Sequence, residues 1–469
     1  MGAIAGEYAG ASLGDERRTA RLVAVAEKLE REPSVGFPRA IGSEAELEAF
    51  YRFINNDGFS AEAALAPHRN ATLSRARDHK EVVVVHDTTL VEYSTPRDGL
   101  GVTTTGHQGF VAHVSLVIAG KVPLGVAHVE TMTRSGKKWR SRKASRRLVR
   151  EDSQRESLRW LRGVDAIEQV RGEQFGAVHI TDAEGDFFEL LAAIHQASAR
   201  FIIRAGQLDR VVNAGSDEKS LRDCIQSIAV GATRTIELSE RKYPPRTAAR
   251  SKQRRHPPRA ARNATVAIGA TSVTLKKTQY SDKQCEPFAV NVVRVWEPHP
   301  LEGQPSVEWV LLTNEDVSTK DALERVVDLY RQRWIIEEYF KALKTGCALE
   351  KRQVESYEAL CKVLALFIPI AYRLLLLRGM ERAKPTAPAL DGFTTTELHI
   401  MSKAPSNKGM KPAVTMNDAL LHLARLGGHL RNNGPPGWQT LGRGYEKLLM
   451  LRLGWEMALA SMNERSDQS

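Results

Sequence analysis

The sequence has few cysteines, no basic leader at its N-terminus and no uninterrupted hydrophobic run of membrane-spanning length. Its four cysteines lie far apart and lack the Cys-x-x-Cys spacing of a structural zinc site or the density of a disulfide framework. The opening residues, MGAIAGEYAG, lack the features of a secretory signal. Lys362, Pro369 and Arg373 interrupt the most apolar stretch, 359–377, which predicts a buried helix. These absences predict a cytoplasmic protein with no membrane contact.

The composition is that of a folded protein with some preference for an anionic partner. Hydrophobic residues make up 42% and charged residues 26% of the 469-residue chain, which is ordinary for a globular protein. A chain of this length is expected to divide into two or three domains. The net charge of +11 favours a nucleic acid, although such modest basicity also suits an ordinary enzyme.

Hydrophobic patterning predicts three domains. Residues 1–78 have helical character and no strand pattern, and residues 365–469 are again mainly helical. The segment 79–364 contains short apolar runs typical of strands in a sheet covered on both faces. A second β-rich stretch within it, about 200–320, is predicted to be an inserted β subdomain. The predicted fold class is therefore α/β with helical flanking domains.

Two groups of cations are candidates for DNA contact. A first helix, capped by Asp15, opens with Arg17, Arg18 and Arg21, for which a solvated charged face is an equal alternative. The segment 241–262 holds nine cations, four prolines and no acid, which favours an extended loop along a polyanion over a merely solvated or disordered segment. The candidate contacts in that loop are Arg246, Arg250, Lys252, Arg254 and Arg255.

Two aspartates are predicted to follow the ends of apolar strands. Asp87 comes after the run 82–85, and Asp182 comes directly after 177–181. Open α/β sheets place ligand sites at the carboxyl ends of their strands. Taken singly, however, either acid has a structural alternative, because Asp87 suits a turn and Asp182 suits a helix N-cap.

A third acid lies on the predicted helix 330–344. At about 100° per residue, Tyr330, Arg333, Glu337 and Lys344 fall within about 60° of one another, which places a carboxylate among cations. The opposite side carries the apolar residues Ile335, Ile336, Tyr339 and Leu343. For an isolated helix, a surface ladder of ion pairs is the preferred explanation of this stripe. Together with the two aspartates, it instead predicts three carboxylates that bind Mg²⁺ for phosphodiester chemistry.

These residues resemble the DDE transposases of bacterial insertion sequences, specifically the insertion-sequence-four family typified by the transposon-five transposase. The family signature Tyr-x2-Arg-x3-Glu-x6-Lys is matched by the same four residues of the predicted helix. Further likeness lies in 13–22, in 42–45 with 51–54, in 86–89 and in 424–428. The resemblance therefore runs nearly the length of the chain, and it includes Arg52 as a further candidate for DNA contact.

The resemblance implies a ribonuclease-H-like catalytic core in which Asp87, Asp182 and Glu337 hold two Mg²⁺ ions, with Mn²⁺ as a substitute. It implies a cut-and-paste transposase that nicks transposon ends, forms and resolves hairpins, and joins the ends to target DNA. Its partners would be the double-stranded inverted repeats, the target DNA and a second copy of the chain in a homodimeric synaptic complex. Activity on chromosomal or plasmid DNA in the bacterial cytoplasm would follow.

The resemblance also implies roles for residues near the acids. Tyr330, Arg333 and Lys344 would grip phosphates, and Arg204 would lie near the DNA. Trp309, with Trp334 as helper, would stack on an extruded base, although a core position in a strand is the alternative for Trp309.

Two other functions remain open at this stage. A DNA-binding protein descended from a transposase would bind ends without cutting them. A structure-selective nuclease would cut without joining.

Overall fold

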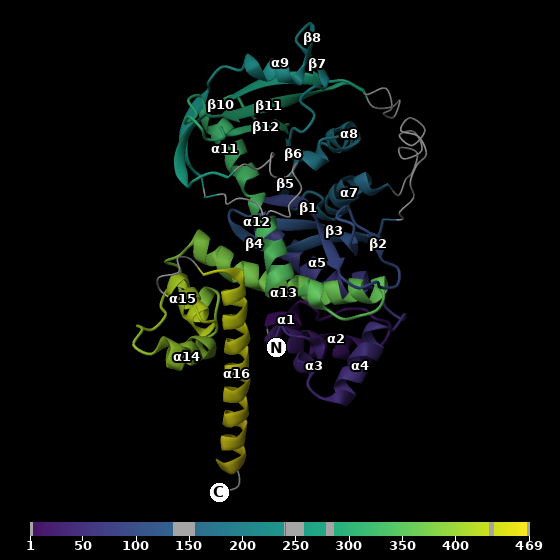
Figure 1. Ribbon diagram of the computed structural model, residues 1–469, viewed down its shortest axis with the longest axis vertical. Helices are drawn as coiled ribbons and strands as arrows, with labels where there is room; N and C mark the ends of the chain where they lie inside the picture. Colours follow the sequence, from purple (N-terminus) through teal and green to yellow (C-terminus); the bar gives the residue numbers. More distant parts are fainter. Residues whose placement is uncertain are drawn as a thin grey trace. The chain divides into compact units, whose positions relative to one another are not determined.

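The computed structural model describes residues 3–134, 155–238, 240, 258–277, 286–430 and 436–466. The chain forms two compact units, whose elements are labelled in Figure 1. The first unit comprises Met1–Arg140, Asp165–Gly176 and Trp334–Ser469, and the second comprises Ser141–Val164 and Ala177–Arg333. Asp87 and Glu337 therefore belong to the first unit, and Asp182 belongs to the second.

The first unit begins with short helices. These are α1 (Ala3–Gly6), α2 (Glu16–Arg31), α3 (Phe37–Ile41), α4 (Glu44–Ile54) and α5 (Ala61–Arg77). The side chain of Asp15 accepts a hydrogen bond from Arg17 N and caps α2, while Ser43 caps α4 through Glu46 N. The predicted N-cap at Asp15 is thus confirmed, as is the helical character of this segment.

An antiparallel sheet follows in the first unit. β3 (Gln108–Ala119) lies between β1 (Glu81–Tyr93) and β4 (Val122–Met132), and the short β2 (Gly101–Val102) also pairs with β3. Strand β1 is longer than predicted, because every residue from Val83 to Tyr93 has a partner on β3. Asp87 is therefore inside the strand, opposite Val114, and the prediction that it follows the strand is wrong.

Helices complete the first unit. They are α12 (Trp334–Lys341), α13 (Tyr357–Ala383), α14 (Thr395–Lys403), α15 (Met416–Leu426) and α16 (Trp438–Ser466), with 3-10 turns at Leu349–Lys351, Ala389–Asp391 and Pro405–Asn407. Among the described helices, α13 is long and apolar enough to cross a membrane by length and composition, but 83% of its most apolar window is buried in the protein. This confirms the prediction of a buried helix there.

The second unit is built on a mixed sheet. β5 (Gly176–Thr181) and β6 (Arg200–Arg204) pair in parallel and are joined through α8 (Phe188–Gln196). From β6 the order continues through β12 (Glu308–Thr313), β11 (Phe288–Trp296), β10 (Arg262–Leu275), β7 (Val211–Ala214) and β8 (Asp217–Ser220), and β9 (Ala232–Leu238) pairs with β10. The helices are α9 (Leu221–Gln226) and α11 (Lys320–Arg331), with 3-10 turns at Glu156–Leu158 and Ala183–Gly185, and α7 (Arg159–Arg171) begins in this unit and continues into the first from Asp165. A β-rich insertion thus separates β6 from α11, as predicted.

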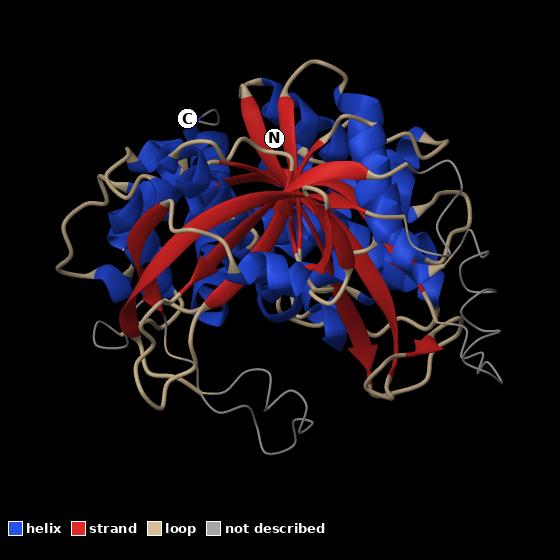
Figure 2. Ribbon diagram, turned by 90° about the horizontal axis from the view of Figure 1, so that it is seen from above, coloured by secondary structure: helices blue, strands red, loops and turns tan. Residues whose placement is uncertain are grey.

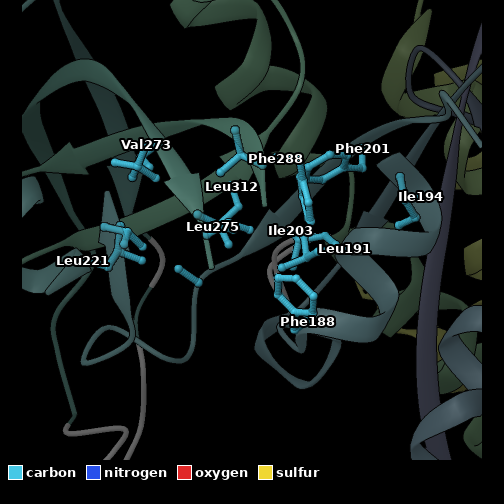
Figure 3. Close-up of a cluster of buried hydrophobic side chains, with 14 of the residues drawn as sticks. Phe188, Leu191, Ile194, Phe201, Ile203, Leu221, Val273, Leu275, Phe288 and Leu312 are labelled. Atoms are coloured by element: carbon cyan, nitrogen blue, oxygen red, sulfur yellow. The ribbon is translucent and has the colours of Figure 1, made fainter. Parts of the chain in front are cut away.

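A buried apolar cluster holds the second unit together. Figure 3 shows Phe188 and Leu191 of α8 facing Ile203 of β6, with Leu275 and Leu312 of the insertion alongside. Each of these side chains is buried, so the cluster stabilises α8, β6 and the insertion as one core. Strand β5, which ends just before Asp182, is hydrogen-bonded to β6 of this core.

The predicted helix 330–344 is interrupted. α11 ends at Arg331, α12 begins at Trp334, and Ala342–Gly346 forms a π-helix. The prediction of one continuous helix is therefore wrong, and so is the expectation that one straight stripe carries the four signature residues. Figure 2 shows that the protein contains both helices and strands, and the order of the elements along the chain confirms the α/β class with helical flanks and an inserted β subdomain.

Candidate active site

Asp87 and Glu337 lie on the same side of the sheet in the first unit. Directly opposed residues of antiparallel strands point to the same face of the sheet, and so do residues two positions apart along one strand. Followed from β1 through β3 to β4, this rule places Asp87 and Thr131 of β4 on the same face. Thr131 Oγ1 is 2.9 Å from the hydroxyl of Tyr357 on α13, which identifies that face. Helix α12, which carries Glu337, packs on both α13 and β1. Both acids are partly exposed.

Glu338, the neighbour of Glu337, fixes α12 against α13. Its Oε2 atom lies 2.5 Å from Arg382 Nη1 and 3.6 Å from Arg378 Nε. Burial lowers the pKa of Arg378, and the charge of Glu338 acts in the opposite direction. A buried carboxylate requires such cationic partners. The contacts of Glu338 with the two arginines therefore fix the orientation of α12 and of its other side chains.

Lys344 is tied to strand β1. Its ammonium donates a hydrogen bond to the Leu90 carbonyl and lies 3.0 Å from Glu350 Oε1. Glu350 also accepts a hydrogen bond from Glu92 N, at 3.3 Å. Lys344 is thus a bridge between the segment after α12 and the strand that carries Asp87.

Asp182 lies at the carboxyl end of β5 in the second unit, as predicted. Its Oδ1 accepts a hydrogen bond from Glu184 N at 2.8 Å, so it also caps the following 3-10 turn. Thr181 pairs with Ile203 in the parallel ladder, and Asp182 and Arg204 therefore emerge from neighbouring strands at the same end. The structural and the catalytic roles considered for Asp182 are compatible.

Tyr330 and Arg333 are neighbours of Asp182 and Arg204. Burial raises the pKa of Tyr330, the positive charges of Arg333 and Arg204 act to lower it, and the charge of Asp182 adds to the rise. The Tyr330 side chain is buried, whereas Arg204 is exposed. The end of β5 in the second unit therefore combines one carboxylate with two guanidinium groups.

The two tryptophans lie in different units. Trp309 on β12 is half-buried, and it shares a face with Arg204, because Arg204 pairs with Leu311 two residues further along β12. Trp334, at the start of α12, is 55% exposed, and Lys341 Nζ lies 5.6 Å from its ring centre. Both rings are thus accessible at least in part.

The cations predicted to contact DNA differ in their surroundings. Arg17, Arg21 and Arg52 are exposed, whereas the Arg18 guanidinium donates hydrogen bonds to the carbonyls of Leu13 and Gly58. The loop candidates Arg246, Arg250, Lys252, Arg254 and Arg255 lie outside the described residues. At the end of that basic segment, Arg262 forms an ion pair with Glu297 at 2.6 Å.

The three acids are a suitable donor set for a divalent metal, because Mg²⁺ prefers carboxylate oxygens. Within the described parts of the chain, no group of three or more His, Cys, Asp or Glu side chains is assembled as a metal site. The structure brings Asp87 and Glu337 to one side of a sheet, and Asp182 belongs to the other unit. Convergence of all three remains a prediction.

Glu338 and Glu350 were not among the predicted site residues. Glu338 had a partial signal in the sequence, since Arg378 and Arg382 stand four residues apart at the end of a mainly apolar helix and cations there need acidic partners. Glu350 had none, because its contact with Lys344 depends on the fold of the intervening chain.

Two domain families match the chain. Residues 1–59 match the family described as Transposase DNA-binding, and residues 164–368 match the Transposase DDE domain. The second match includes Asp182 and Glu337, whereas Asp87 lies between the two. These matches define the class: the chain carries a transposase DNA-binding domain and a DDE transposase domain, and so belongs with the DDE transposases. DDE transposases generally use divalent metal ions.

Among solved structures, the chain is similar to one described as the piggyBac transposase synaptic complex with hairpin DNA. The TM-score is 0.36 at 10% sequence identity, and the match covers 78% of this chain and 66% of that chain. The chain thus spans just under two thirds of that protein's length. A likeness at this level does not indicate which reaction steps this chain performs.

Proposed function

We propose that this protein is a cut-and-paste transposase of the insertion-sequence-four family, in which Asp87, Asp182 and Glu337 form one catalytic triad. The observation that supports this most directly is that α12, which carries Glu337, packs on the strand that carries Asp87. The domains would be 1–78 for end binding, 79–364 for catalysis, including an insertion at about 200–320, and 365–469 for dimerisation.

The three carboxylates would hold two Mg²⁺ ions, for which Mn²⁺ would substitute. When bound, such a pair stabilises the attacking and leaving oxygens of a phosphodiester during in-line displacement. The chain's own task is to place the DNA. Arg333 and Lys344 would contact phosphates of the transposon end, and the buried Tyr330 would orient Arg333.

The reaction would proceed by four displacements at the same three acids. Water nicks one strand at the transposon end, and the released 3′-hydroxyl attacks the opposite strand to form a hairpin. Water then opens the hairpin, and the 3′-hydroxyl finally attacks a target phosphodiester. The tight bend of a hairpin requires an extruded base, for which Trp309 and Trp334 offer aromatic faces.

The remaining cations would bind DNA outside the reacting phosphates. The exposed Arg17, Arg21 and Arg52 would contact the inverted repeat, with Arg204 nearer the acids. Two further groups belong to the same proposal: Arg18, and the loop residues Arg246, Arg250, Lys252, Arg254 and Arg255. Such contacts supply affinity and position the duplex.

We also propose that the active complex is a homodimer on two DNA ends in the bacterial cytoplasm. Support comes from α16, whose second half exposes apolar side chains at helical spacing: Leu451, Trp455, Leu459 and Met462. In Figure 1 this half of α16 extends beyond α14 and α15.

An end-cleavage assay tests the proposed function. The purified protein is incubated with Mg²⁺ and DNA that carries the inverted repeats flanking its coding region. Nicks at the element boundary and joined products are expected. Binding without nicks would favour the non-cutting DNA-binding protein, and nicks without joined products would favour the nuclease.

A further inference from the structure

The chain after α12 adopts two uncommon backbone conformations. Ala342–Gly346 is a π-helix, and Ala348 has a φ of 49°, in the left-handed region that residues other than glycine rarely adopt. A 3-10 turn at Leu349–Lys351 follows. Such costly conformations persist where the surrounding contacts demand them, and they often mark functional sites. Here they bring Lys344 and Glu350 to the same strand.

The contacts of Lys344 and Glu350 lie along one edge of β1. Alternate residues of an antiparallel strand direct both backbone polar groups to the same side, so the Leu90 carbonyl and Glu92 N emerge together. Lys344 donates a hydrogen bond to that carbonyl, and Glu350 Oε1 accepts one from that N–H at 3.3 Å. The 3.0 Å ion pair then joins the two side chains. The two side chains therefore form hydrogen bonds with the backbone groups at this edge of β1, as a neighbouring strand would.

The pair is only partly exposed, with 27% of the Lys344 side chain and 35% of the Glu350 side chain accessible. A second carboxylate stands nearby. Burial acts to raise the pKa of Glu92, but hydrogen bonds from Thr103 and Thr105 and the charges of His107 and Lys344 lower it. An ammonium has three donors, so Lys344 keeps one for a phosphate after serving Leu90 and Glu350.

We infer that Glu350 is a positioning residue for the reaction: it holds Lys344 against β1 and thereby keeps the helix of Glu337 in place over the strand of Asp87. Lys344 is seven residues after Glu337, and Leu90 is three residues after Asp87. The rise from Glu337 to Lys344 along the helix and the rise from Asp87 to Leu90 along the strand are both about 10 Å, at about 1.5 Å per helical residue and about 3.3 Å per strand residue. A shift at this bridge would therefore displace the two acids relative to each other.

This inference rests on the proposed function, and the test separates the two. Glu350→Gln keeps the size and one acceptor but removes the charge that binds Lys344. The matched control is Glu355→Gln, which changes an exposed glutamate in the same segment. For each protein we would measure single-turnover nicking against Mg²⁺ concentration, affinity for the transposon end, and amide exchange across Leu90–Tyr93.

The expected result for Glu350→Gln is at least tenfold slower nicking, a higher Mg²⁺ requirement, unchanged end affinity and faster exchange at Glu92. A purely structural loss would lower end binding and thermal stability in step with nicking, and that result overturns the inference. So does nicking at the wild-type rate. If Glu350→Gln does not fold, Glu350→Ala, which also removes the charge, is measured by the same criteria. Absence of nicking by the wild-type protein would instead refute the proposed function, and the exchange measurement would then decide whether Glu350 holds the bridge.

Discussion

Glu338 Oε2 lies 2.5 Å from Arg382 Nη1, and this ion pair joins α12 to α13 one residue from Glu337. Successive helical residues point about 100° apart, so Glu337 is directed away from the anchor that its neighbour makes. Two adjacent glutamates thus have separate tasks. Glu338 fixes the helix, and Glu337 is the residue proposed for chemistry.

Glu338→Gln is expected to lower the free energy of unfolding by about 1.5–3 kcal/mol, the usual worth of a hydrogen bond to a charged group. Urea unfolding measures this. Glu48→Gln is the control, because the pair of Glu48 with Arg52 is 74% exposed on both sides and 4.0 Å long, and such a surface pair is worth little. Equal changes in the free energy of unfolding for the two substitutions would show that Glu338 does not anchor α12 to α13.

Trp309→Ala is expected to leave the first nick within about threefold of the wild-type rate and to slow hairpin formation about tenfold or more. The reason is that base stacking is worth about 1–3 kcal/mol and is needed only when the end is bent. Gel analysis of nicked and hairpin products separates the steps. Equal loss of both would identify Trp309 as a packing residue of β12.

His68 gives the first unit a specific dependence on pH. The buried ring accepts a hydrogen bond from Val126 N through Nε2 at 3.1 Å, and its Nδ1 lies 2.5 Å from Glu7 Oε2. An accepting Nε2 carries no proton, so the ring is neutral. Burial lowers the pKa of His68 below its ordinary value of 6.5, although Glu7 acts in the opposite direction.

The unfolded chain therefore binds a proton at His68 more readily than the folded protein does. Stability from this group is complete above about pH 6.5 and decreases as the pH falls below that value. Thermal unfolding between pH 7.5 and about 5 should show this decline. His68→Gln, which cannot titrate, should show a weaker decline, and an unchanged slope would contradict the assignment.

The exposed end of α16 is expected to mediate dimerisation on DNA. Leu459→Glu combined with Met462→Glu should convert the end-DNA complex from two protein copies to one, because a charge is costly to bury at an apolar contact. Lys447→Glu, at an exposed position of the same helix, is the control. Analytical ultracentrifugation with end DNA counts the copies. An unchanged dimer would exclude this surface.

Local chemistry made much of the fold predictable from the sequence. The cap Asp15 and the apolar run of β5 have signals within a few residues, and their elements were predicted correctly. Strand β1 was predicted too short, because its polar residues Thr88 and Thr89 concealed a ladder that depends on pairing with β3. Tertiary pairing extends a strand in ways that local composition does not indicate.

The signature residues show the same limit. Spacing placed Tyr330 and Lys344 on one helical stripe, but the helix break before Trp334 and the π-helix after Lys341 remove that regularity. Tyr330 is buried, and Lys344 bonds to β1. Neither break has a proline or glycine at its start to announce it. Contacts with α13 and β1, made by residues distant in sequence, govern the path of this segment.

The most direct test of the shared triad is single-turnover nicking of a cognate transposon end in Mg²⁺ by Glu337→Gln, with Asp87→Asn and Asp182→Asn measured in parallel. Each substitution removes a negative charge and little volume. The account predicts that all three lose nicking by about a thousandfold or more while keeping end affinity, because in-line displacement depends on the metal pair that they hold. Wild-type nicking by any one of them would contradict the assignment of that acid and with it the single site.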